Sequence, residues 1–223
     1  MKLFNQITLI VFIFLLSACA TKPKTDVAVA DKTVDVGAVA GPAFLEESLP
    51  SKLKQGLKQA KQLAKQNDPQ AASALLEKLK VEFPTYPHSD LNLALIALDA
   101  KEYVLAQSLV ENSLRVRDNY PPSLNLLGVL ARFDGKFEAA KTYYERAISA
   151  EPNYATAYLN LGVLADLYLQ DYRLAKRSFS KYLEYDADND KVSNWLVELK
   201  RRVPDAPSTP ATTTPANNGG NDD

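Results

Sequence analysis

A 34-residue periodicity of small and large side chains is the feature that most restricts how this chain can fold. Steps of 34 from Gly128 reach a small residue every time. A second small residue follows twelve positions after each of these, and a large apolar residue follows sixteen positions after the same starting residue. The last copy has one inserted residue before both. The three sets are Ala60, Ala94, Gly128 and Gly162; Ala72, Ala106, Ala140 and Ala175; and Leu76, Val110, Tyr144 and Phe179. Such sets predict helix pairs that approach closely at the small residues.

Within each repeat, the apolar residues recur at helical spacing. Leu124, Leu127 and Leu130 illustrate the pattern, and no segment alternates with a period of two for long. Turn-forming residues such as Asn67-Asp68 and Asp134-Gly135 separate the two halves of a repeat. We therefore predict an all-α fold built from helix-turn-helix units.

This pattern resembles the tetratricopeptide repeat (TPR). The best matching segment has Leu124-x-x-Leu127-Gly128-x-x-Ala131, followed by Phe137, Ala140, Tyr144, Ala147 and Pro152. The next best has Tyr158-x-x-Leu161-Gly162-x-x-Ala165, followed by Tyr172, Ala175 and Phe179. The resemblance implies a right-handed superhelical solenoid of four repeats, at 53–86, 87–120, 121–154 and 155–189. Repeat four departs from the family at Tyr182, where a small residue is usual.

The segment after the repeats is predicted to form a capping helix over residues 190–203. Val192, Trp195, Leu196 and Leu199 fall on one face of it and are expected to cover the apolar side of repeat four. Trp195 is expected to pack within this cap rather than to bind a partner. Residues 204–223 are rich in Pro, Thr, Ala, Asn and Gly, which predicts a disordered tail.

The N-terminus has the composition of a secretory signal, with Met1-Lys2 before a mostly apolar stretch. It ends in Leu16-Ser17-Ala18-Cys19, which resembles the lipobox of bacterial lipoproteins. The resemblance implies removal of residues 1–18 and lipidation of Cys19, palmitate included. By resemblance to the sorting rule of enterobacterial lipoproteins, Ala20 in place of Asp implies anchoring in the outer membrane on the periplasmic side. Residues 19–50 are then a lipidated cysteine and a flexible linker. The alternative is an uncleaved signal anchor.

Composition argues against several classes of function. A net charge of -1 gives no general affinity for nucleic acid, and one Cys with one His excludes a His/Cys zinc site. Glycine-rich phosphate loops and nucleophile motifs are absent from the sequence. We therefore expect no enzyme, metal, cofactor or small-molecule substrate. The sole histidine, His88, is expected to be a solvated residue at the start of a helix.

The family resemblance implies that the first helix of each repeat lines a concave groove that binds a peptide segment. Asn125 and Asn160 are expected to hydrogen-bond a ligand backbone, and Arg132 to bind a carboxylate. The predicted groove residues are Lys54, Leu57, Lys61, Leu91, Asn92, Leu95, Asn125, Val129, Arg132, Asn160, Val163 and Asp166, with Leu98, Phe133 and Leu159 as further candidates. The alternative is that some of them pack inside the superhelix.

Four lysines form a stripe in the first repeat. Lys54, Lys58, Lys61 and Lys65 are spaced so that they fall on one face of a helix. Such a face is usually solvated. The alternatives are contact with an acidic partner or with anionic lipid head groups near the tether.

The function predicted from these features is that of a scaffold with a protein or peptide partner in the bacterial envelope. TPR lipoproteins that assist type IV pilus biogenesis have a similar layout of lipobox, spacer and repeats. Two alternatives stay open: an adaptor that recruits a periplasmic protease or a cell-wall synthesis enzyme, and a cytoplasmic-facing, signal-anchored adaptor.

Overall fold

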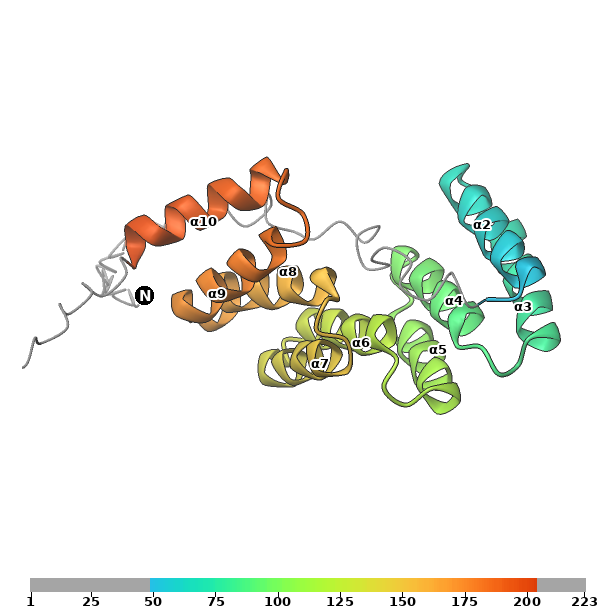
Figure 1. Ribbon diagram of the computed structural model, residues 1–223. Helices are drawn as coiled ribbons and strands as arrows, with labels where there is room; N and C mark the ends of the chain where they lie inside the picture. The colour runs from blue at the N-terminus through green and yellow to red at the C-terminus, as the bar shows by residue number, and fades with distance from the viewer. Residues whose placement is uncertain (1–48, 204–223) are drawn as a thin grey trace, which may run out of the picture. The chain divides into compact units, whose positions relative to one another are not determined.

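The computed structural model describes residues 49–203, and every regular element in that range is a helix (Figure 1). The helices are α2 (Ser51–Lys65), α3 (Pro69–Glu82), α4 (His88–Asp99), α5 (Tyr103–Val116), α6 (Pro121–Phe133), α7 (Phe137–Ala150), α8 (Ala155–Leu164), the π-helix η2 (Ala165–Leu169), α9 (Tyr172–Leu183) and α10 (Asp190–Arg202). The predicted signal, most of the linker and the predicted tail lie outside the described residues.

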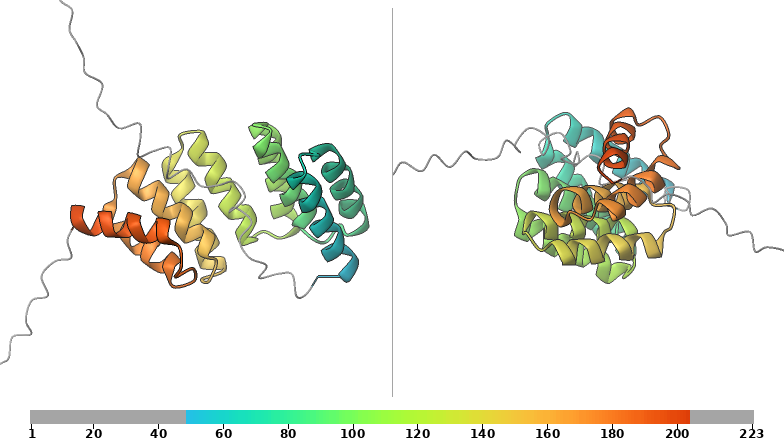
Figure 2. Two further views of the ribbon diagram at one scale, coloured as in Figure 1. Left: turned by 90° about the horizontal axis from the view of Figure 1, so that it is seen from above. Right: turned by 90° about the vertical axis from the view of Figure 1, so that its left-hand side faces the viewer.

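The helices are arranged as successive pairs. Each first helix (α2, α4, α6, α8) packs mainly against the helix that follows it, and each second helix then packs against the first helix of the next pair. Figure 2 shows these pairs following one another in chain order, with α10 against the last. The all-α solenoid with a capping helix, predicted from the repeat, is confirmed.

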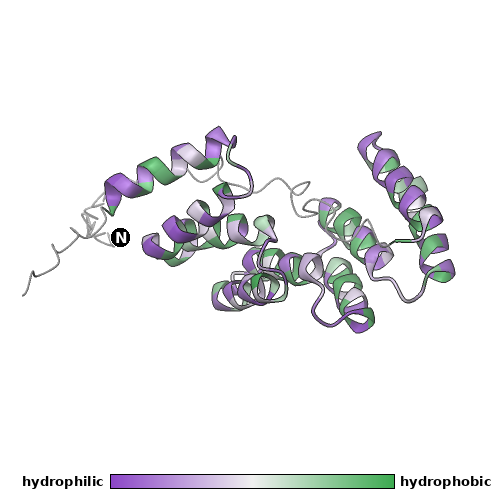
Figure 3. Ribbon diagram, viewed as in Figure 1, coloured by the Kyte–Doolittle hydropathy of each residue, from purple (hydrophilic) through white to green (hydrophobic). Residues whose placement is uncertain are grey.

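The recurring small and large residues meet inside each pair. A Cβ atom added at Gly128 would collide with the Tyr144 ring, and one added at Gly162 would lie 2.5 Å from the Phe179 ring. Both rings are fully buried. In the first two repeats Ala60 and Ala94 are the buried small residues. Figure 3 shows the apolar colours gathering where neighbouring helices face each other.

The turn inside each helix pair contains one residue with left-handed backbone conformation. The φ angles are 64° at Asn67, 62° at Lys101, 73° at Gly135 and 54° at Gln170. These positions repeat with the same period as the small residues, allowing for the inserted residue of the last repeat. Only Gly135 adopts this conformation without the steric cost of a Cβ atom.

The inserted residue of repeat four lies in a π-helical turn. After α8 the backbone continues through η2, Ala165–Leu169, and ends at the left-handed Gln170. A π-helix has its hydrogen bonds between residues i and i+5, so one turn of it accommodates one more residue than an α-helical turn. The small and large residues that follow therefore keep their positions against α8.

Helix α10 covers repeat four through Val192, Leu196 and Leu199, which are buried with Phe179 in one apolar cluster. Trp195 packs on Phe179 with 5.6 Å between the ring centroids. The Asn189 side chain caps α10 by accepting from the Val192 amide at 3.2 Å. Trp195 therefore packs within the cap, as predicted.

Tyr182, the departure from the repeat pattern, contributes to this cap. Its hydroxyl accepts a hydrogen bond from Asn189 Nδ2 at 3.0 Å and donates one to Asp186 Oδ2. Burial and the Asp186 carboxylate raise the pKa of Tyr182 to about 12. A large polar residue at this position thus connects α9 to the start of the capping helix.

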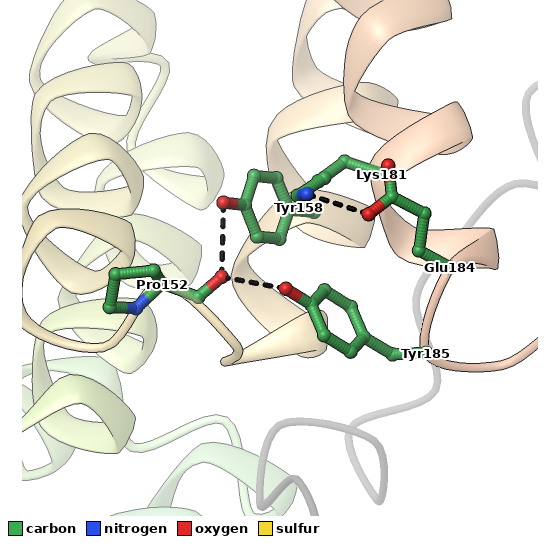
Figure 4. Close-up of polar contacts among 5 residues, drawn as sticks. All are labelled: Pro152, Tyr158, Lys181, Glu184 and Tyr185. Atoms are coloured by element: carbon green, nitrogen blue, oxygen red, sulfur yellow. Dashed lines mark hydrogen bonds and ion pairs between the residues drawn. The ribbon is translucent and has the colours of Figure 1, made fainter.

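A shared acceptor joins repeat four to the turn before it (Figure 4). The hydroxyls of Tyr158 and Tyr185 both donate to the Pro152 carbonyl oxygen, at 3.1 and 3.2 Å. Their rings stack with 6.4 Å between centroids. Lys181 lies over the Tyr185 ring and pairs with Glu184 at 2.6 Å. These contacts fix the end of α9 against the turn between α7 and α8.

Residues 49–203 include no helix that is both long enough and apolar enough to cross a bilayer.

The turns allow a direct test of backbone strain. Lys101→Gly is expected to be about 1 kcal/mol more stable than Lys101→Ala, because both remove the side chain and only glycine relieves the left-handed strain. At Gly135 no atom lies within 4 Å of an added Cβ, so the Gly135→Ala variant is expected to lose about the same amount of unfolding free energy through backbone strain alone. Urea unfolding of the full chain measures all three. Equal stability of the two Lys101 variants would contradict this explanation.

Candidate functional site

The predicted groove residues lie on the four first helices, except Asp166, which lies in η2 directly after α8. The structure divides them into accessible and buried sets. Lys54 and Lys61 of α2 are exposed, while Leu57 of α2 and Asn92 and Leu95 of α4 are half-buried. Helices α2 and α4 contact each other directly. The accessible set is therefore a partly apolar surface with lysines beside it.

Most of the other predicted residues are buried. The buried ones are Leu91, Asn125, Val129, Arg132, Asn160, Val163 and Asp166, with the further candidate Leu98. Of the other two further candidates, Phe133 is 51% exposed and Leu159 is half-buried. A partner reaches the accessible set without rearrangement of the fold, whereas contact with the buried set requires side chains to move. A binding role for either set stays a prediction.

Two asparagines of the buried set are bonded to each other across α6 and α8. Asn160 Nδ2 donates to Asn125 Oδ1 at 2.9 Å, and both side chains are almost completely buried. Asn125 Nδ2 and Asn160 Oδ1 have no hydrogen-bond partner. An unsatisfied buried polar atom costs about 1–3 kcal/mol. The pair therefore retains one donor and one acceptor, the combination that a peptide group satisfies.

Arg132 lies near two aromatic rings. Its guanidinium carbon is 5.0 Å from the Phe133 centroid and 5.7 Å from that of Tyr168, and its Nη1 donates to the Tyr168 hydroxyl at 3.4 Å. Stacking of this kind holds a guanidinium in a fixed plane. Binding of a partner's carboxylate by Arg132 stays a prediction.

Asp166 connects the first helix of repeat four to the cap. Its carboxylate is 3.5 Å from Arg202 Nη1 of α10, and Arg202 also pairs with Glu198 on its own helix. Asp166 lies in η2, the π-helical turn. Tyr168 and Arg202 were not predicted from the sequence as partners of groove residues. The one-residue insertion in repeat four was the sequence signal that could have pointed to Tyr168. Such an insertion is accommodated by a π-helical turn, and π-helical turns are often found at functional sites.

The structure corrects the prediction that His88 is solvated. Its side chain is only 9% exposed and packs between Tyr86 and Tyr120, with ring centroids at 6.3 and 5.4 Å. Neither ring nitrogen has a hydrogen-bond partner. Burial, followed by the nearby Arg117 charge, lowers the pKa of His88 to about 4. His88 is therefore a neutral packing residue at neutral pH.

A mainly apolar hollow of about 310 Å³ lies between α5, α6 and α7, with Asp134 and Lys136 also on its wall. Phe133 is the one residue of its wall that the sequence predicted as a groove candidate. Tyr103 and Phe133, whose rings are 5.8 Å apart, and Tyr143 form part of its wall. Val104 beside it is 87% exposed. The hollow has no acidic or basic cluster that specifies a ligand. The sequence signal for it was the pair Tyr103-Val104, two apolar residues at the start of a helix.

His88 predicts a pH dependence of stability. The histidine pKa is about 6.5 in the unfolded chain and about 4 in the fold, so protonation favours unfolding. The stabilisation is complete above pH 6.5 and is lost as the pH falls toward 4, by at most about 3 kcal/mol. Urea unfolding between pH 7 and pH 4 measures it.

The control for this prediction is His88→Phe, which keeps an aromatic ring and removes the titrating group. Because the chain has one histidine, the difference between the two curves isolates its contribution. Parallel curves for the two proteins would show that His88 does not titrate as expected.

Comparison with known proteins agrees with this architecture. A family model described as tetratricopeptide repeat matches residues 121–154 and 155–189. PilF of Pseudomonas aeruginosa is similar with a TM-score of 0.60 and 18% identity, over 67% of this chain and 68% of that chain. A thermophilic TPR protein of Thermus thermophilus is similar with a TM-score of 0.55 and 22% identity, over 67% of this chain and 82% of that chain. MamA of Desulfovibrio magneticus is similar with a TM-score of 0.53 and 17% identity, over 70% of this chain and 87% of that chain. At these identities the solved structures show a shared fold.

Proposed function

We propose that this chain, which matches the tetratricopeptide-repeat family model over residues 121–154 and 155–189, is a non-catalytic scaffold, lipid-anchored through Cys19 to the periplasmic side of the outer membrane. In this proposal it binds a protein or peptide partner for an envelope assembly machinery. The tether follows from the lipobox-like Leu16-Ser17-Ala18-Cys19. The interaction role follows from the repeats.

The observation that carries the interaction role is the accessible surface of α2 and α4. Leu57, Asn92 and Leu95 are half-buried there, so each is held in place by the core and still has surface left to contact a partner. A partly apolar floor of this kind suits the apolar side of a helix or of an extended segment. Asn92 Nδ2 donates to the His88 carbonyl at 2.7 Å, which leaves its side-chain oxygen as an acceptor for the partner.

Type IV pilus biogenesis is the machinery we favour. The likeness to PilF of Pseudomonas aeruginosa supports this choice at the level of fold. The order of lipobox, spacer and repeats in the sequence supports it at the level of layout.

Site-specific photocrosslinking in intact envelopes tests the proposal. A photoreactive residue in place of Leu95 is expected to capture a pilus component such as a secretin subunit. The same residue in place of Val81 of α3, which is 81% exposed, is the matched control and is expected to capture little. Mass spectrometry identifies the captured protein. A peptidase or a penicillin-binding protein captured specifically at Leu95 would contradict the pilus assignment.

The same strains test the tether when Cys19 is replaced by Ser. The variant is expected to leave the outer-membrane fraction and to lose radiolabelled palmitate. Unchanged fractionation, together with a band that does not shift when signal peptidase II is inhibited, would favour a signal anchor over lipidation.

A further inference from the structure

The exposed face of α2 is cationic and has no acidic residue. The helix sequence SKLKQGLKQAKQLAK contains five lysines and no Asp or Glu. Leu53, Gly56 and Ala60 are buried on its inner side, which fixes the lysines on the outer side. Figure 3 shows the hydrophilic colour along α2. The charge is thus held on one side by packing.

Within the described residues, four of these lysines are not neutralised by an ion pair. Lys52, which lies off the stripe, pairs with Glu82 of α3. Lys54, Lys58, Lys61 and Lys65 are exposed, and the salt bridges between described residues include none of them. Their spacing covers about 16 Å along the helix, enough to face several lipid head groups. The lysine stripe is therefore an uncompensated line of positive charge.

We propose that the lysine stripe of α2, Lys54, Lys58, Lys61 and Lys65, docks on an anionic membrane surface. This inference rests on the proposed membrane attachment. Helix α2 is the first helix of the described residues, and the length of residues 20–50 limits how far it can move from a lipidated Cys19. A tether of this kind makes the docking step intramolecular, so individually weak contacts suffice.

Charge complementarity favours this occupant. Each lysine close to an anionic leaflet strengthens association by about fivefold, and the attraction decays within about 8 Å at physiological salt. The stripe therefore acts only in direct contact with the surface. The glutamines beside it, Gln55, Gln59 and Gln62, add hydrogen-bonding groups without opposing charge. Docking in this manner orients the first repeat relative to the membrane.

Lysine labelling of the full chain in lipid vesicles tests the proposal. The chain is reconstituted through its own N-terminus into vesicles of phosphatidylcholine, or of phosphatidylcholine with one third phosphatidylglycerol. Mass spectrometry then follows the acetylation of Lys54 and Lys61. Acetylation is expected to slow about fivefold or more in the anionic vesicles, and to recover at high salt.

Two double variants distinguish an effect of the lysine stripe from an effect of the total positive charge of the chain. Lys58→Gln with Lys65→Gln removes half of the stripe and leaves both groove lysines in place, and is expected to abolish most of the slowing. Lys78→Gln with Lys200→Gln removes the same amount of charge from exposed positions of α3 and α10. In this variant the acetylation of Lys54 and Lys61 is still expected to slow in the anionic vesicles.

Equal labelling in the two kinds of vesicle would overturn the proposal. So would slowing in neutral vesicles on addition of inorganic phosphate or an acidic peptide, because the stripe would then bind a soluble anion. Neither result bears on partner capture at Leu95, so failure of the docking proposal is distinguishable from failure of the proposed function.

Discussion

The close contact between a small residue on one helix and a large residue on the next is the interaction on which the rest of this structure depends. Gly128 against Tyr144 and Gly162 against Phe179 leave no room for one additional carbon atom. The contact sets the distance between the helices of a pair, and thereby the surface that the pair presents to the next repeat. In a solenoid, stability is approximately a sum of such repeats and their interfaces.

The polar side chains of the last two repeats show how this packing limits the binding surface. The Asn125–Asn160 pair crosses from one repeat to the next, and Asp166 pairs with Arg202 of the cap. Groove positions in this half of the solenoid thus take part in holding the repeats and α10 together. The first half is different: α2 and α4 leave Leu57 and Leu95 half-exposed, so we place partner contact there.

The fold was predictable from the sequence because its signal is periodic. Small residues at a spacing of 34 identify the helix pairs without knowledge of their contacts, and even the insertion of repeat four is visible as a one-residue shift. The site was less predictable. Whether Val129 or Asn125 is accessible depends on packing between repeats, which the spacing does not encode. The burial of His88 likewise depends on Tyr120, which lies in the turn between α5 and α6 and is distant in sequence.

A double-mutant cycle on Gly128 and Tyr144 tests the central contact most directly. Gly128→Ala alone is expected to destabilise the full chain by about 1–3 kcal/mol, because the added carbon collides with the buried ring. In a Tyr144→Leu background, where the smaller side chain leaves space, the same substitution is expected to cost little, giving a coupling energy of at least about 1 kcal/mol in urea unfolding. If the two substitutions are simply additive, the small–large contact does not set the helix spacing and this account of the fold is wrong.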